Sequence, residues 1–306
     1  MRLLLVVVAW GVTGRLLAEY GVHFLPLAVA SQMSLQSYLA LVNVVVTAFG
    51  LVLSVTLLDR PWQALGVTSP RPAAVARILL ATPLIYVAVS YAAVLIALPS
   101  LLAELRSHGV EGVRQSTGEF GNQVVHSPAA LALLWAALIA PAAEELWFRG
   151  ALWTLLADAV RRVRPGPAPA AEPELPEGVV ERSRVLEGAR AVPRWFREGG
   201  IATLLVAALF AVSHADTPGG MGIVRVVSAA GLGIACGTVR QATGSTVAAF
   251  ALHAVFNTLS LATARRWVVT SLFPTRLMVP TLLSLLAVFC LLALAVLVVF
   301  SRKRAR

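Results

Sequence analysis

Long apolar runs, separated by short polar segments, make up most of this 306-residue chain. A helix crosses the hydrocarbon core of a bilayer with about 20 residues, and several of the runs are that long. We therefore predict eight apolar helices, at residues 3–30, 35–58, 76–104, 129–157, 199–215, 223–241, 244–263 and 277–300. Arg15, Glu19 and Pro26 interrupt the first of them, so a count of seven or nine also fits the pattern.

Composition points to the same fold class. The chain is 58% hydrophobic and 13% charged, whereas soluble domains average about 45–50% apolar and about 25% charged residues. Its mean hydropathy is +0.81. We predict an all-α fold, a polytopic membrane helix bundle with a buried polar cavity, in which residues 1–306 form a single integral membrane domain. A water-soluble binding module is excluded.

The net charge of +10 comes from arginines in the loops and in the C-terminal tail rather than from one basic face. The connection 161–199 is rich in arginine, and its Pro/Ala/Glu stretch predicts a flexible loop. By the positive-inside rule this loop and both termini are cytoplasmic in a multi-pass protein of the cell membrane, although the basic loop 264–276 runs against the rule. Membrane lipid is therefore an expected partner, and nucleic acid is not.

Three polar motifs, each spaced like one turn of helix, lie within the apolar segments. They are Glu144-Glu145-x-x-x-Arg149, Phe210-x-x-x-His214 and His253-x-x-x-Asn257. Ionisable groups at membrane depth are costly and usually face the interior of a bundle, where they have a function. We predict that the three motifs meet at one buried polar site within a catalytic core at residues 129–262.

The first motif predicts different roles for its two carboxylates. Glu145 and Arg149 share a helix face and can form an ion pair. Glu144 points about 100° away and is free to act as a base. Pro141 lies three residues earlier and frees a backbone carbonyl, which can open a small polar pocket. A plainer interpretation is that both glutamates only pair with Arg149.

The other two motifs also have plainer interpretations. Phe210 alone would be core packing, and His214 alone would be a residue at a helix end. His253 and Asn257 share a face in mid-span and need hydrogen-bond partners, which an interhelical structural contact would provide.

Together these groups predict a hydrolytic centre. Glu144 and His214 would activate water, while His253 and Asn257 would stabilise an oxyanion. Glu144, His214 and His253 are also candidate ligands for a divalent metal such as zinc, but no His-Glu-x-x-His motif occurs. Cofactor use stays open. The only cysteines, Cys236 and Cys290, lie in predicted spans and support neither a disulfide framework nor a cysteine-based zinc site.

The motifs resemble those of the CAAX prenyl endopeptidase/Abi (CPBP) family of intramembrane proteases. Glu144 to Gly150 is similar to the first family motif, Phe210 to His214 to the second, and Thr243 to Asn257, with its leading Thr-Gly-Ser, to the third. The resemblance covers about residues 129–262 and implies an eight-helix bundle with a polar cavity. The connection 161–199 is longer than the family pattern leads us to expect.

The resemblance also implies roles for single residues. Glu144 resembles the water-activating glutamate and His214 its partner, while His253 and Asn257 resemble the oxyanion-binding pair. Glu145, Arg149 and Phe210 would support them. Members of the family have been described both as metalloproteases and as glutamate proteases.

The resemblance implies an endopeptidase that acts on a membrane-associated or lipidated peptide or protein, and eukaryotic members remove the last three residues after a prenylated cysteine. One alternative is a non-catalytic scaffold or bacteriocin-immunity protein of the same fold. Another is a proton-coupled transporter with Glu144 and His214 as a relay, although no internal repeat is visible.

Overall fold

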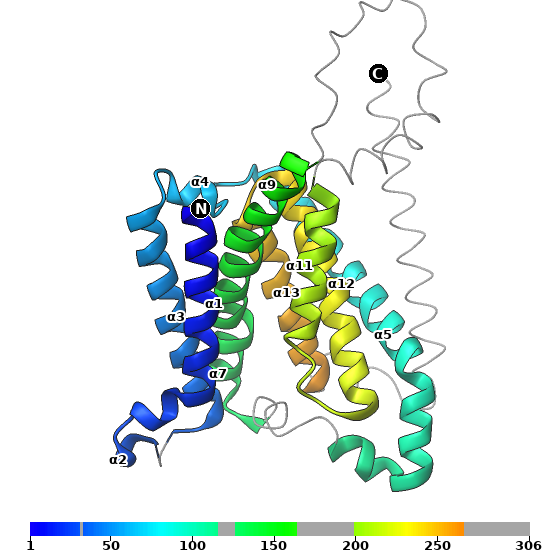
Figure 1. Ribbon diagram of the computed structural model, residues 1–306. Coiled ribbons are helices and arrows are strands. Elements are labelled where there is room, and N and C mark those ends of the chain that lie inside the picture. Colours follow the sequence, from blue (N-terminus) through cyan, green and yellow to red (C-terminus); the bar gives the residue numbers. More distant parts are fainter. Residues whose placement is uncertain (31–32, 116–125, 164–198, 266–306) are drawn as a thin grey trace, which may run out of the picture.

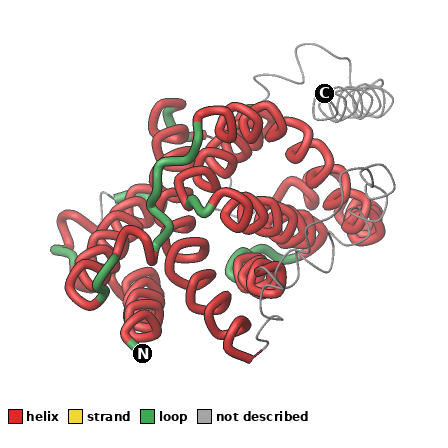
Figure 2. Tube along the Cα trace, turned by 90° about the horizontal axis from the view of Figure 1, so that it is seen from above, coloured by secondary structure: helices red, strands yellow, loops and turns green. Residues whose placement is uncertain are grey.

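The computed structural model describes residues 1–30, 33–115, 126–163 and 199–265. Within these ranges every regular element is helical and no strand occurs (Figure 2), which confirms the all-α prediction. In the described part of the chain, six helices are long and apolar enough to cross a membrane: Arg2–Phe24, Ser37–Leu57, Pro72–Gly109, Ala129–Val163, Gly219–Thr243 and Thr246–Ala264. The chain is therefore a multi-pass membrane helix bundle.

The described helices account for the first seven predicted ones, because the shorter apolar helix Ile201–Val212 stands where 199–215 was predicted. The eighth predicted helix, 277–300, the C-terminal tail and nearly all of the 161–199 loop lie outside the described residues.

The first half of the chain forms three long helices and short connecting ones. These are α1 (Arg2–Tyr20), the 3₁₀ turn η1 (Gly21–Phe24), α2 (Leu27–Ala30), α3 (Leu35–Leu57), α4 (Pro61–Ala64) and α5 (Pro72–Gln115). The interrupted first helix, predicted over 3–30, consists of α1, which ends at Tyr20, and of two short helical segments, η1 and α2. Pro26 explains part of the break, since the residue before a proline disfavours the helical region and Leu25 is extended.

The fourth span is continuous but changes its winding twice. It consists of α7 (Ala129–Leu133), the π-helix η2 (Leu134–Ile139), α8 (Ala140–Glu145), the π-helix η3 (Leu146–Leu152) and α9 (Trp153–Val163). The remaining helices are α11 (Ile201–Val212), α12 (Gly219–Thr243) and α13 (Thr246–Ala264).

Helix α12 packs between α5 and α11, and α13 packs against α5, α12 and the fourth span. The N-terminus, α4, the end of α9 and the turn from α12 to α13 lie at the same end of the bundle (Figure 1). The N-terminus therefore lies on the same side of the bundle as the connection from α3 to α5 and the end of α9.

The turn between α12 and α13 is fixed by a loop from the other half of the chain. Gly244 ends α12 in the left-handed conformation, with φ 68°, and Ser245 caps α13 through its side chain. Two hydroxyls then donate to the loop that follows α4: Ser245 Oγ to Thr68 O at 2.6 Å and Thr246 Oγ1 to Leu65 O at 2.6 Å. Ser245 and Thr246 therefore attach the start of α13 to the loop that follows α4.

We expect Thr246→Val to destabilise the fold. The change keeps the shape of this buried side chain but leaves the carbonyl of Leu65 without its donor, which costs about 1–3 kcal/mol. Thr258→Val is the matched control, because the Thr258 hydroxyl bonds only to Ala254 O in its own helix. Thermal unfolding in detergent compares the two variants. Equal melting temperatures would contradict the stabilising role of the hydrogen bond from Thr246 to Leu65 O.

Candidate active site

The two glutamates of the first motif lie between two π-helical turns. Before them, the N–H of Ala140 bonds to Trp135 O, five residues back. After them, the N–H of Trp153 bonds to Phe148 O, also five residues back. Such widened turns are rare and often occur at functional sites. Pro141, which has no N–H, follows the first turn and gave a sequence signal for irregular winding; the second turn had no such signal.

Glu145 and Arg149 form a fully buried ion pair. Arg149 Nη1 lies 3.0 Å from Glu145 Oε1, and both side chains are 0% exposed. The guanidinium carbon also lies 4.4 Å from the centre of the Phe210 ring. Desolvated cations gain about 2 kcal/mol or more from such a ring face. The ion pair expected from the spacing is present, and Phe210 has a specific electrostatic contact in addition to its packing.

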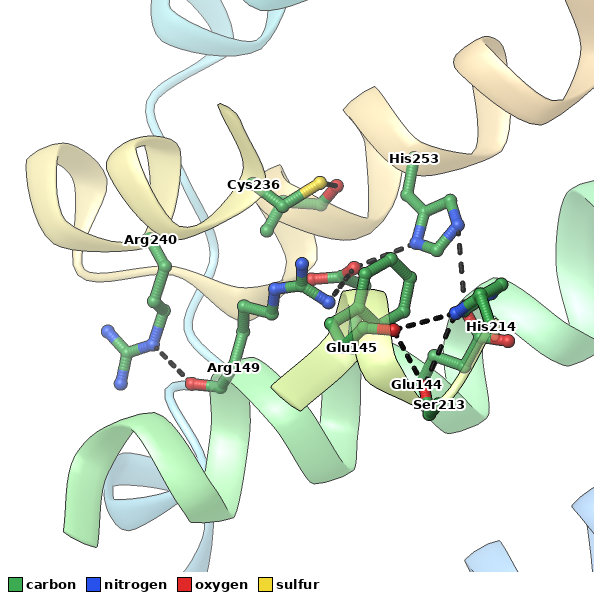
Figure 3. Close-up of polar contacts among 10 residues, drawn as sticks. Glu144, Glu145, Arg149, Ser213, His214, Cys236, Arg240 and His253 are labelled. Atoms are coloured by element: carbon green, nitrogen blue, oxygen red, sulfur yellow. Dashed lines mark hydrogen bonds and ion pairs between the residues drawn. The ribbon is translucent and has the colours of Figure 1, made fainter. Parts of the chain in front are cut away.

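His253 contacts both carboxylates (Figure 3). Its Nδ1 lies 2.8 Å from Glu145 Oε1, and its Nε2 lies 3.6 Å from Glu144 Oε2. A carboxylate oxygen accepts hydrogen bonds when ionised, so the Nδ1 of His253 carries a proton toward Glu145. Sequence reasoning paired Glu144 with His214 and placed His253 beside Asn257; the imidazole that the structure places against Glu144 is that of His253.

The two glutamates differ in how far their side chains are exposed. The side chain of Glu144 is 27% exposed, whereas that of Glu145 is 0% exposed. Glu145 is held by Arg149 and His253, and Glu144 is open to a water molecule or a substrate. The geometry therefore agrees with different roles for these adjacent carboxylates.

His214 follows the C-terminal end of α11 and folds back onto it. Its Nδ1 lies 2.8 Å from Phe210 O, and because a carbonyl only accepts, Nδ1 is the donor. The lone pair of a neutral His214 is then on Nε2, which can take a proton or bind a metal. The Phe210 ring lies 4.5 Å from the His214 ring and 5.8 Å from the His253 ring, centre to centre. Phe210 thus joins the second motif to the third.

Asn257 donates from Nδ2 to Ala136 O at 2.9 Å. Ala136 lies in the first π-helical turn, where the N–H of Ala140 bonds to Trp135 O instead. The interhelical hydrogen bond considered for Asn257 is therefore present, and it engages one of the two N–H groups of the amide.

The described residues contain one group of three ligating side chains whose donor atoms lie within 4.8 Å of one another: Glu145, Cys236 and His253. This set differs from the predicted ligands Glu144, His214 and His253. Its oxygen, sulfur and nitrogen donors suit zinc by type. Glu145 Oε2 has no hydrogen-bond partner among the residues described, which leaves its lone pairs for a cation. Arg149 already supplies a positive charge at the same carboxylate.

Comparison with known proteins identifies one family. Residues 126–259 match the family described as type II CAAX prenyl endopeptidase Rce1-like. The matched segment contains all three motifs and confirms the resemblance predicted from them. No curated protein and no solved structure matches the chain.

We expect Arg149→Met to destabilise the protein strongly, because Glu145 would stay buried without its counter-charge. Breaking a buried ion pair on one side costs about 3–5 kcal/mol. The double variant Glu145→Gln/Arg149→Met removes both charges and should recover much of that loss. Melting temperatures in detergent measure both effects.

Arg161→Met is the control, because Arg161 pairs with Asp158 at an exposed position. Exposed pairs contribute about 0–1 kcal/mol. If Arg149→Met and Arg161→Met melted at the same temperature, the buried pair would not have the stabilising role inferred for it.

Proposed function

We propose that the chain is an intramembrane endopeptidase, because its residues 126–259 match the family of Rce1-like type II CAAX prenyl endopeptidases. Its substrate is a membrane-associated or lipidated peptide or protein. One observation carries the proposal: a partly exposed carboxylate, Glu144, lies against a buried imidazole, while its neighbour Glu145 is locked in an ion pair.

In the proposed reaction, Glu144 takes a proton from a water molecule, and the water oxygen attacks the carbonyl carbon of the scissile peptide bond. The Nε2 of His214 accepts a hydrogen bond from the same water and orients it, without taking a proton. The carbonyl π bond opens to an oxyanion, which re-forms the C=O bond as the C–N bond breaks, and the proton passes from Glu144 to the leaving amine. Atoms and charge balance without a further reactant.

The oxyanion needs preorganised donors. The remaining N–H of Asn257 is one, because its other N–H is held on Ala136 O. His253 is the second: its Nδ1 lies on Glu145, and its Nε2 donates to the oxyanion when that nitrogen also carries a proton. Loss of one such donor typically lowers kcat by about 10²–10³.

Glu144→Gln and His214→Ala should each abolish cleavage while the protein still folds, because a positioned base contributes about 10²–10⁴-fold to the rate. Glu19→Gln is the matched control at a partly exposed ion pair with Arg15, away from the site. Comparative proteomics of membrane peptides from cells with intact or Glu144→Gln protein would identify the cleaved substrates.

Normal turnover by either site variant would remove the mechanism. Identical membrane peptides in all strains would instead favour the non-catalytic scaffold or immunity function.

The remaining question about cofactors is whether the reaction needs a divalent metal. If bound, it would supply a Lewis acid and an activated water. Glu144, His214 and His253, or the group of Glu145, Cys236 and His253, would hold it. We propose that the reaction proceeds without it, because Arg149 already compensates the charge of Glu145.

Cleavage should therefore persist after treatment with a chelator, and Cys236→Ala should retain activity. Elemental analysis of the purified protein measures zinc directly, and activity measured after dialysis gives the second readout. Loss of activity that added zinc restores would contradict the metal-free reaction; loss of that restoration in Cys236→Ala would assign the metal to the Cys236 group.

We also propose that the end of the bundle with the N-terminus, α4 and the end of α9 is cytoplasmic, with the C-terminus on the same side. The arginine-rich connection 161–199 supports this orientation by the positive-inside rule.

A further inference from the structure

A second buried arginine, Arg240 of α12, reaches into the fourth span. The residue is 6% exposed. Its Nε donates to the carbonyl oxygen of Arg149 at 3.1 Å, and its Nη2 donates to Thr154 Oγ1 at 3.5 Å. The guanidinium carbon lies 5.0 Å from the centre of the Trp153 ring. Figure 3 shows the side chain approaching the backbone at Arg149, on the opposite side of Glu145 from His214.

The second π-helical turn takes the usual backbone donor away from the carbonyl of Arg149. In an α-helix the N–H of Trp153 would bond to Arg149 O, four residues back. In this structure it bonds to Phe148 O instead. The Nε of Arg240 therefore takes the position of the lost backbone donor. A buried carbonyl without a donor is costly, so this contact stabilises the widened turn over an ordinary α-helical turn.

The same arrangement occurs on the other side of the glutamates. There the N–H of Ala140 bonds to Trp135 O, and Asn257 donates to the bypassed carbonyl of Ala136. Each π-helical turn around Glu144 and Glu145 is thus matched by one donor from another helix. Since adjacent helical positions differ by about 100°, the state of these turns decides where both carboxylates point.

The pocket around Arg240 is closed by a specific backbone feature. A Cβ atom on Gly66 would lie 2.3 Å from the guanidinium carbon of Arg240, and Gly66 has a φ of 64°. The loop that carries Gly66 also binds the turn between α12 and α13, because Thr246 N donates to Gly66 O. Arg240 is therefore held from two sides, and its own freedom to move is small.

We propose that Arg240 is a positioning residue for catalysis: its Nε–H holds the second π-helical turn and thereby the alignment of Glu144 and the Glu145–Arg149 pair. This proposal rests on the proposed function. It predicts that kcat depends on a hydrogen-bond donor at the Nε position, and that a positive charge without this donor does not maintain kcat.

Three substitutions separate these properties. In Arg240→Gln the amide nitrogen occupies the place of Nε and keeps a donor without the charge. The Arg240→Met side chain is as long as that of Gln but has a methyl group at the place of Nε and therefore no donor. Arg240→Lys keeps the charge but has a methylene group at that place. We expect the Gln variant to stay close to the intact protein in kcat, and the Met and Lys variants to fall by about ten- to hundredfold.

The assay substrate is a fluorogenic peptide copied from a membrane peptide that accumulates in Glu144→Gln cells. KM should change little, because the lost contact aligns the reacting groups and does not bind substrate. Equal kcat for the Gln and Met variants, or a Lys variant as active as the intact protein, would overturn the proposal. If Arg240→Met does not fold, the comparison of Gln with Lys decides in the same way.

Backbone hydrogen exchange gives a readout that does not need activity. Amides of residues 146–153 should exchange faster in the Met and Lys variants than in the Gln variant, because the π-helical turn opens more often. If the intact protein cleaved no peptide, the proposed function would fail while this measurement would still test the contact. Unchanged exchange in all three variants would overturn the role of Arg240 itself.

Discussion

The structure depends on the compensation of charge at membrane depth. Glu145 and Arg149 are both 0% exposed in a helix that lies among apolar helices. A lone charge there would be highly unfavourable, whereas a neighbouring opposite charge compensates it. His253 adds a hydrogen bond to the carboxylate, and Phe210 covers the guanidinium. Two helices, α13 and α11, must therefore approach the fourth span closely, and this requirement brings the motifs together.

The site also depends on the irregular winding of the fourth span. Two π-helical turns on either side of the glutamates leave carbonyl groups that their own helix does not satisfy in the usual way. Side chains from α13 and α12 supply the donors. Tertiary contacts and local winding therefore support each other, since the turn creates the acceptor and the donor stabilises the turn. A regular α-helix would need neither Asn257 nor Arg240 at these positions.

Much of this site follows from the sequence. The pairing of Glu145 with Arg149 follows from their spacing, and the helical fold follows from the apolar runs. The contact of His253 with both carboxylates could not be predicted from the sequence, because the rotation of one helix against another is set by packing over many residues. Arg240 gave no signal, since an arginine near a helix end resembles an orienting charge. The interruption of the first helix follows from Arg15, Glu19 and Pro26, but its end at Tyr20 does not, because apolar residues continue beyond that position.

The difference between Glu144 and Glu145 shows how environment assigns chemistry to identical groups. They are adjacent in sequence and belong to one helix. Glu144 is 27% exposed and lies 3.6 Å from an imidazole, while Glu145 is enclosed by a guanidinium at 3.0 Å and an imidazole at 2.8 Å. A carboxylate bound by two donors has little freedom to exchange a proton with water. The exposed neighbour has that freedom, and its proximity to His253 places a proton donor beside it. Separation of two carboxylates by their surroundings is a general route to an acid–base pair, and in this chain the two carboxylates lie between the π-helical turns of the fourth span.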